Sequence, residues 1–133
     1  MATYHLQIVT PDGLYFDGEA EKLIVRSTTG DVCILAHHIN YVTALGMGVA
    51  KVTIDGQERR AACVGGMLSV HEGEVKLVST TFEWSEDIDV ERAHRAEEKA
   101  KEKLANRDKL GDQELALAEA KLKRALIRQS AAK

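Results

Sequence analysis

Two arginines near the end of the chain carry the clearest chemical signal in the sequence. Arg124 and Arg128 are four residues apart, and on a helix this spacing puts both side chains on one face. A guanidinium group donates hydrogen bonds in a fork that matches phosphate oxygens. The pair therefore indicates a site for a phosphate-bearing ligand. The alternative is that both arginines, like Arg92, are solvated charges on an exposed helix, which stabilise little.

Histidines and cysteines raise the question of a metal site. His37 and His38 are adjacent, and His71 is a third candidate ligand. Adjacent residues of an extended segment point to opposite faces, so such a pair seldom holds one ion. Cys33 and Cys63 match no zinc or disulfide spacing and lie in apolar, strand-like segments, which favours packing roles in a reducing compartment. We therefore predict no metal site.

The elements that position these residues fall into two parts of different composition. All the aromatic residues lie at or before Trp84, as do the single proline and nine of the ten glycines. After residue 88 the sequence consists mostly of Ala, Leu, Lys, Arg and Glu. A composition typical of strands and turns thus gives way to one typical of helices. We predict one domain at residues 1–86 and a second at residues 87–133.

Residues 1–86 have the pattern of short strands separated by turns. Asp55-Gly56 between two strand-like runs is the strongest hairpin signal, and Gly65-Gly66 predicts another turn. Many short strands without an intervening helix indicate an antiparallel β-sandwich. The predicted strands are residues 5–9, 14–16, 22–26, 32–35, 41–45, 49–54, 58–64, 67–71 and 74–78.

Residues 87–133 have the pattern of a two-helix antiparallel hairpin, so the fold class is α+β. Asp89 and Asp112 are suitable N-caps, and the first helix is expected to end near Arg107. The apolar stripe is mostly alanine and buries little area per turn, so we predict a hairpin that docks weakly and can leave its dock. The stripe comprises Val90, Ala93, Ala96 or Glu97, Ala100 and Leu104, then Leu115, Ala118, Leu122, Ala125, Leu126 and Gln129.

Charge is divided between the two parts. Residues 1–87 contain 6 Lys and Arg against 12 Asp and Glu, a net charge of −6, whereas residues 88–133 contain 12 against 9, a net charge of +3. The acidic part argues against a nucleic-acid partner, and the basic part fits an acidic protein surface or a polyphosphate. No secretory signal and no membrane-spanning run is evident, so we expect membrane association only through a partner.

Several short motifs, in this order and at this spacing, resemble the epsilon subunit of bacterial rotary (F-type) ATP synthases over nearly the whole chain. They are residues 8–13 (IVTPDG), 30–38 (GDVCILAHH), 42–45 (VTAL), 65–70 (GGMLSV) and 88–93 (IDVERA). The chain departs from the family at Cys33, where glycine is usual, and at Ala36 and Asn40, where proline is usual.

The resemblance implies a non-catalytic, central-stalk (rotor) subunit that couples proton or sodium flow to ATP synthesis. In the family, the sandwich contacts the gamma subunit and the ring of c subunits, here expected to involve Asp31 and His38. The helices can extend toward the catalytic alpha and beta subunits and inhibit ATP hydrolysis. The implied location is the cytoplasmic face of the cell membrane, peripherally bound.

The resemblance further implies ATP as a regulatory ligand, with no required cofactor. Family members that bind ATP use an Ile/Leu-Asp-x-x-Arg-Ala motif, a preceding glutamate and two arginines four residues apart. Because the chain contains no hydrolytic phosphate loop, the nucleotide would select a conformation. The corresponding residues are Glu83, Ile88, Asp89, Arg92, Ala93, Arg124 and Arg128.

Two interpretations from other classes stay open. One is a free-standing β-sandwich protein that binds a small molecule or a metal, although the sequence contains no clustered His/Glu ligands and no nucleophile–base arrangement. The other is a helical adaptor that pairs with another coiled coil, for which the second part is short and poor in leucine. Co-purification with gamma distinguishes the epsilon subunit from both.

Overall fold

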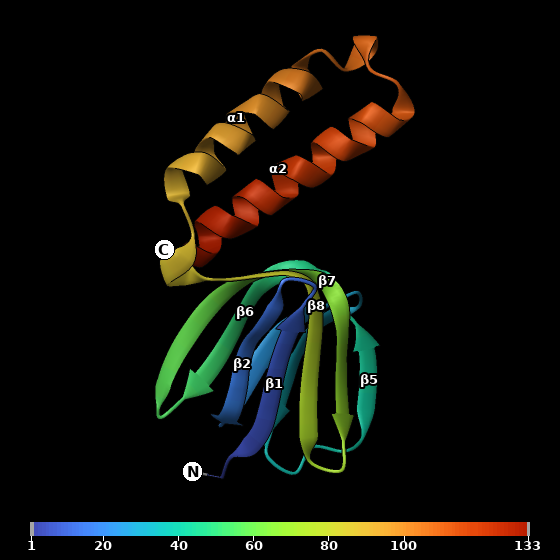
Figure 1. The fold of residues 1–133 in the computed structure, drawn as a ribbon. Helices are drawn as coiled ribbons and strands as arrows, with labels where there is room; N and C mark the ends of the chain where they lie inside the picture. Colours follow the sequence, from blue (N-terminus) through green and yellow to red (C-terminus); the bar gives the residue numbers. More distant parts are fainter. Residues whose placement is uncertain (1, 133) are drawn as a thin grey trace.

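A computed structural model describes residues 2–132, and Figure 1 shows a β-sandwich with a helical hairpin at one end. The eight strands are β1 (Tyr4–Thr10), β2 (Gly13–Ala20), β3 (Lys22–Ser27), β4 (Gly30–Leu35), β5 (Tyr41–Ala44), β6 (Met47–Ile54), β7 (Gln57–His71) and β8 (Glu74–Trp84). They are followed by η1 (Ser85–Asp87), α1 (Val90–Ala105), η2 (Arg107–Lys109) and α2 (Asp112–Ala132). The predicted sandwich followed by two helices is confirmed.

The sandwich is built from one bent sheet with the strand order β2-β1-β8-β7-β6-β3-β4, and β5 also pairs with β7. Side chains alternate between the core and the outer face, as in β1, where Tyr4, Leu6 and Ile8 are buried. Inward side chains from all parts of the sheet form a single core around Phe82 and Leu77. The strand pairs within residues 2–132 are antiparallel, as predicted, except β1 and β8, which are parallel.

The turn predicted at Gly65-Gly66 is wrong, because β7 runs through both glycines. The first half of β7 pairs with β6 and its second half with β5, and the change of partner falls at these residues. Gly66 has φ +112°, and a Cβ there would lie 1.9 Å from the carbonyl oxygen of Val78. The two glycines therefore provide close backbone approach within a long strand.

Three further expectations need correction. Cys33 is exposed rather than packed, whereas Cys63 is buried as predicted. β8 continues from the predicted limit at residue 78 to Trp84, whereas α1 ends at Ala105, close to the predicted end near Arg107. Asp112 is the first residue of α2, and the first helical hydrogen bond runs from the Leu115 amide to the Gly111 carbonyl, which places Gly111 at the cap.

The helices pack antiparallel through alanine, as predicted. Ala93 and Ala100 of α1 and Ala118 and Ala125 of α2 are buried. Val90 and Leu126, which were assigned to the same stripe, are instead 49% and 45% exposed. No helix within residues 2–132 is long and apolar enough to span a membrane.

The hairpin contacts the sandwich through the end of α2. Ala131 packs with Ile88 and with Ala62 of β7, and half-buried Val49 and Ile127 complete this small cluster. The cluster is separate from the main core of the sandwich. A small cluster of alanine, valine and isoleucine side chains thus holds the hairpin in place.

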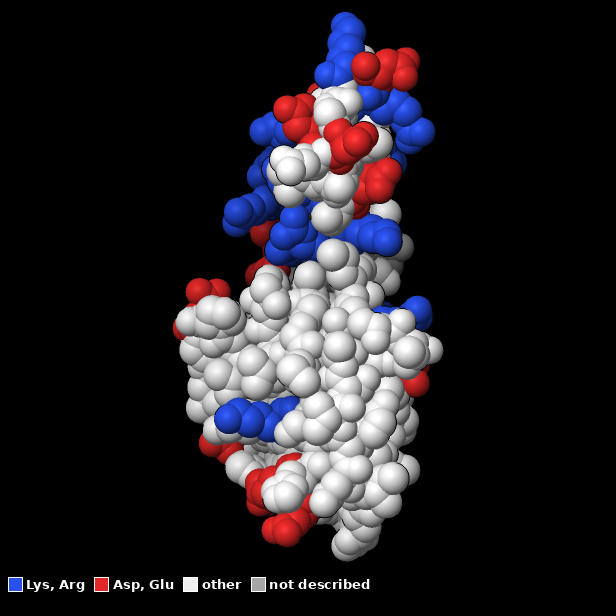
Figure 2. All heavy atoms as spheres, turned by 90° about the vertical axis from the view of Figure 1, so that its right-hand side faces the viewer, with Lys and Arg blue, Asp and Glu red and all other residues white. Residues whose placement is uncertain are grey.

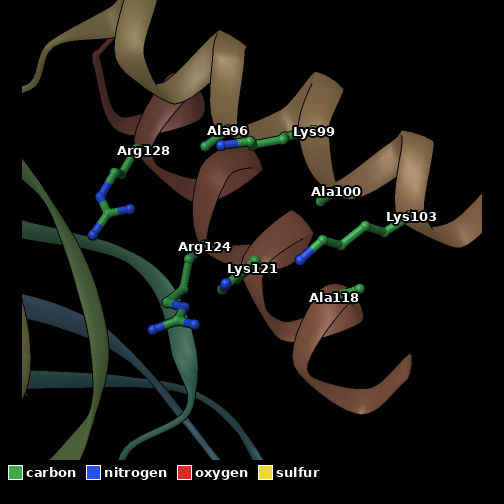
Figure 3. A pocket seen from close by; sticks show the side chains of 8 residues that line it. All are labelled: Ala96, Lys99, Ala100, Lys103, Ala118, Lys121, Arg124 and Arg128. Atoms are coloured by element: carbon green, nitrogen blue, oxygen red, sulfur yellow. The ribbon is translucent and has the colours of Figure 1, made fainter. Parts of the chain in front are cut away.

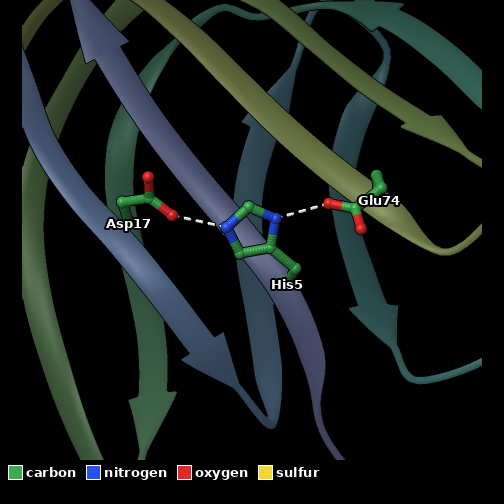
Figure 4. A network of polar contacts seen from close by, with 3 residues as sticks. All are labelled: His5, Asp17 and Glu74. Carbon is green, nitrogen blue, oxygen red and sulfur yellow. Dashed lines mark hydrogen bonds and ion pairs between the residues drawn. The ribbon is translucent and has the colours of Figure 1, made fainter.

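His5 joins three neighbouring strands on the outer face of the sandwich (Figure 4). Its ring nitrogens in β1 contact carboxylate oxygens of Asp17 in β2 and Glu74 in β8. Hydrogen bonds with Asp17 and then Glu74 raise the pKa of His5 from 6.5 to about 9. All three side chains are partly exposed, so solvent and salt weaken the attraction.

This arrangement predicts a stability contribution that disappears at alkaline pH. Because the folded-state pKa lies above the unfolded value, the contribution is complete below pH 6.5 and is lost as the pH rises through about 9. The free energy of unfolding, measured with urea across this range, should therefore fall more steeply for the unmodified chain than for His5→Gln. Parallel pH profiles for the two chains would contradict the prediction.

Candidate functional site

The start of α1 is fixed by its cap. The Oδ1 atom of Asp89 accepts a hydrogen bond of 3.0 Å from the backbone amide of Arg92, as predicted for an N-cap. This bond turns the chain into the helix directly after buried Ile88. The cap thereby fixes the start of α1 and places the Arg92 side chain near Glu83 of β8.

A polar pocket lies between the last strand, the start of α1 and the end of α2. Glu83 extends from β8 into this pocket, and its Oε1 atom accepts a hydrogen bond of 2.6 Å from Nε of Arg128 in α2. Each of these two side chains is 31% exposed. We call this space the motif pocket, and it is lined by Glu83, Asp87, Asp89, Arg92, Ala93, Ala96 and Arg128.

The motif pocket unites most of the residues predicted for nucleotide contact. Glu83, Asp89, Arg92, Ala93 and Arg128 all line it, although they come from three separate elements. The other two predicted residues, Ile88 and Arg124, do not line the motif pocket. Ile88 is buried against Ala62 and Ala131, and Arg124 lines a neighbouring groove.

That neighbouring groove runs between α1 and α2 and has a cavity volume of about 340 Å³. Figure 3 shows cationic side chains entering it from both helices. We call it the basic groove; its lining residues are Ala96, Lys99, Ala100, Lys103, Ala118, Lys121, Arg124 and Arg128. The three lysines did not emerge from the sequence analysis, yet Lys99 and Lys103 repeat the four-residue spacing of Arg124 and Arg128.

The opposite side of the hairpin has a different polar contact. Glu97 is 8% exposed and accepts 2.8 Å hydrogen bonds from Gln129 Nε2 of α2 and from Lys101 Nζ. Hydrogen bonds from Lys101 and Gln129 hold the pKa of the Glu97 carboxyl below its usual range. The sequence analysis left open whether Ala96 or Glu97 faces the stripe; Glu97 is the buried one and links the two helices.

The two residues predicted to contact the ring lie at different places along the sandwich. Asp31, at the start of β4, forms an ion pair with Arg26, in which Oδ1 of Asp31 lies 2.9 Å from Nε of Arg26. Asp31 also lines a shallow pocket beside Ile127 of α2. His38 follows the other end of β4, where its ring lies 5.8 Å from that of Tyr41. The structure therefore does not bring the two side chains together.

An apolar row crosses the outer face of the sandwich. Cross-strand register aligns five residues of β5, β7, β8, β1 and β2 on one face. Leu14 is 58%, Met67 51% and Val78 44% exposed. Figure 2 shows that the side of the sandwich carrying β5 has few charges, whereas charges crowd the hairpin. The apolar row consists of Ala44, Met67, Val78, Val9 and Leu14.

The part of the chain that the structure describes contains no cluster of side chains suited to bind a metal ion. No group of three or more His, Cys, Asp or Glu side chains there could hold an ion. His37 has φ +64°, in the turn after β4, and His71 ends β7.

Two family models together match residues 3–133. Residues 3–85 match the β-sandwich domain of the ATP synthase delta/epsilon chain, and residues 86–133 match its long α-helix domain. The chain is 42% identical to the ATP synthase epsilon chain of Caldanaerobacter subterraneus subsp. tengcongensis over 127 residues, which cover 95% of this chain and 91% of the relative. It is 38% identical to the epsilon chain of Ruminococcus albus over 133 residues, covering 99% and 98%.

A solved structure has the same fold. A chain in the cryo-EM structure of the Euglena gracilis mitochondrial ATP synthase, described as OSCP/F1/c-ring, superposes with a TM-score of 0.85. The alignment covers 100% of this chain and 83% of that one, at 21% sequence identity. This likeness extends over both the sandwich and the helices.

Proposed function

The chain belongs to the ATP synthase delta/epsilon chain family, and we propose that it is a non-catalytic subunit of the central stalk of an F-type ATP synthase. The observation that carries the proposal is the match of both family domains, in order, to the sandwich and the hairpin. Its similarity to epsilon chains covers nearly the whole sequence. The subunit would lie peripherally at the cytoplasmic face of the cell membrane and join the rotor ring to the stalk during ATP synthesis.

The apolar row supports a role for residues 1–86 in binding gamma. Exposed aliphatic side chains at three points of one sheet face favour burial against a protein partner. The row is distant in the sheet from Ala62 and Val49, which the hairpin covers, so both contacts can exist together. Contact with the c ring would use the loop that carries His38 and the exposed side chain of Ile39.

The nature of the hairpin contact supports a regulatory role for residues 87–133. A small cluster of alanine, valine and isoleucine side chains and one partly exposed ion pair, Glu83 with Arg128, join the hairpin to the sandwich. An ion pair of this kind contributes only about 0–1 kcal/mol. The hairpin can therefore leave its dock at low cost, extend along gamma toward the alpha and beta subunits, and inhibit ATP hydrolysis.

The motif pocket supports ATP as the ligand that keeps the hairpin docked. It contains carboxylates that can accept hydrogen bonds from hydroxyl or amino groups and guanidinium groups that can bind phosphate. Because its lining comes from β8, α1 and α2, a bound ligand would connect all three elements and favour the docked state. ATP would regulate the subunit without being cleaved.

Met67→Asp tests gamma binding. A carboxylate in the middle of the apolar row would be desolvated on docking, so co-purification with gamma should drop at least tenfold, a cost of about 1.4 kcal/mol or more. Leu117→Asp is the matched control, because Leu117 of α2 is also 51% exposed but lies outside the row. Undiminished capture of gamma by Met67→Asp would exclude the row as the interface.

Removal of residues 88–133 tests inhibition by the hairpin. The assembled enzyme with the shortened subunit should hydrolyse ATP several-fold faster, since the inhibitory helices are gone, while ATP synthesis driven by the ion gradient continues. Both rates are measured on the same membrane vesicles, with the full-length subunit as the reference. Equal hydrolysis rates in the two preparations would rule out an inhibitory role.

Calorimetric titration of the full chain with ATP tests the motif pocket. We expect saturable binding that Arg92→Ala and Arg128→Ala, which both line the motif pocket, each weaken roughly tenfold, because each loses charge-assisted hydrogen bonds to phosphate. Arg107→Ala, in the loop between the helices, removes the same charge outside both pockets and should leave the affinity unchanged. Heat signals that do not saturate would refute ATP binding.

A further inference from the structure

We propose that Arg59 is a positioning residue, which pins η1 to the sandwich and so places the pivot of the hairpin at Ile88 and Asp89. The chain passes from β8 to α1 through a linker, residues 85–89, which comprises η1 and these two residues. In the proposed function, on which this proposal rests, the hairpin leaves its dock, and backbone rotations in the linker must absorb the movement.

Arg59 of β7 contacts both the end of β8 and η1. Its guanidinium carbon, Cζ, lies 3.9 Å from the ring centroid of Trp84, the last residue of β8, which is a cation–π distance. Its Nη2 atom donates a 2.6 Å hydrogen bond to Oε1 of Glu86 in η1. The ladder between β7 and β8 ends at the pair Ala61–Trp84, and β7 extends past it. This extension brings Arg59 beside the linker.

Trp84 anchors these contacts in the sandwich. Its side chain is 6% exposed and packs edge-to-face on Phe82, with the ring centroids 5.0 Å apart. Both rings belong to the main core. Because interiors are closely packed, Trp84 cannot follow the hairpin without opening that core. Arg59 therefore ties η1 to a part of the sandwich that stays in place.

The contact between Arg59 and Glu86 is charge-assisted. A hydrogen bond from the backbone amide of Glu86 itself, and then one from Arg59, hold the pKa of the Glu86 carboxyl below its usual range. Ser85 Oγ also donates a 3.2 Å hydrogen bond to Oε2 of Glu86. The ion pair is partly exposed, so solvent weakens it, and the stacking of the guanidinium group on Trp84 adds to the attraction. Together the two contacts hold η1 against the sandwich.

The residues after η1 have contacts of a different kind. Ile88 packs with Ala62 and Ala131, so its position depends on the docked hairpin. Asp89 caps α1 by accepting a hydrogen bond from the Arg92 amide, so it moves with the helix. Both residues have extended backbone, with φ of −80° and −83°, a broad region in which ψ can rotate widely. The linker therefore divides at Ile88 into a part tied to the sandwich and a part tied to the hairpin.

A pivot at a defined point favours the return of the hairpin to its dock. With η1 pinned, few backbone dihedral angles have to be fixed again on docking, so the entropic cost is small. Without Arg59, η1 would rotate as well, and Ile88 would reach its place beside Ala62 less often. Arg59 thus favours the docked state through the position of η1.

The test follows two signals in the full chain. Trp84 is the only tryptophan, so the fluorescence emission of the chain reports on the contact with Arg59. Ala62 is 1% exposed and packs with Ala131, so Ala62→Cys reports on undocking through its rate of labelling by a maleimide. All chains also carry Cys33→Ser, which removes the exposed native thiol, whereas Cys63 is buried.

Ala131→Asp puts a carboxylate into the cluster and should raise the labelling rate roughly tenfold, while the emission of Trp84 stays unchanged because Arg59 keeps its contacts. Arg59→Gln should change the emission, because the guanidinium group leaves the ring, and should raise the labelling rate several-fold. Lys76→Gln is the control, since it removes the same charge from an exposed position of β8 and should alter neither signal. Circular dichroism verifies that each variant is folded.

The outcomes separate the pivot from the proposed function. The same emission change in Ala131→Asp as in Arg59→Gln would mean that η1 leaves with the hairpin, which overturns the pivot alone. An Arg59→Gln chain in which either signal equals that of the unmodified chain would overturn it as well. A labelling rate that Ala131→Asp does not raise would instead contradict a hairpin that leaves its dock, and the pivot with it. Inhibition of ATP hydrolysis is measured separately, in the assembled enzyme.

Discussion

The contact between the end of α2 and the sandwich is small compared with the core of the sandwich. Ala131, Ile88 and Ala62 form a cluster of their own, separate from the large core around Phe82. Apolar area that is removed from water contributes about 25 cal/mol per Å², so alanines contribute far less than the leucines and phenylalanine of the main core. The sandwich thus has a large core of its own, whereas the hairpin rests on it through a much smaller apolar contact.

A small contact is sensitive to ligands. Binding to one of two states shifts their populations by the difference in affinity, and a contact worth a few kcal/mol is easily outweighed. Both the motif pocket and the basic groove exist only when the hairpin is closed, since their walls come from separate elements. An anion bound in such a space would therefore favour the closed hairpin.

Patterns that act over a short range of sequence were the ones that could be predicted. The strand alternation, the alanine stripe and the Asp89 cap each depend on neighbours within a few residues, and the structure has all three. The role of Gly65-Gly66 could not be deduced locally, because it depends on β8, which approaches the backbone of β7 from another part of the chain. The exposure of Val90 and Leu126 likewise depends on packing between elements, which the local pattern does not contain.

The same distinction applies to the candidate site. Local spacing identified Arg124 and Arg128, and the family motif identified Arg92. The fold brings Arg92 and Arg128 into one pocket with Glu83. Contacts between distant elements could not be predicted from local spacing. His5, for example, contacts Asp17 and Glu74 only because β1 lies between β2 and β8. Lys121 joins Lys99 and Lys103 only because the helices pack side by side.

The arrangement of surfaces also separates attachment from movement. The apolar row lies on β5, β7, β8, β1 and β2, whereas the hairpin rests on Ala62 of β7 and Val49 of β6. A partner on the row need not touch the residues that the hairpin covers. The hairpin can then undock without loosening the sandwich from its partner, because no residue belongs to both contacts. In the proposed function, this separation would let the sandwich stay attached to the stalk while the helices move.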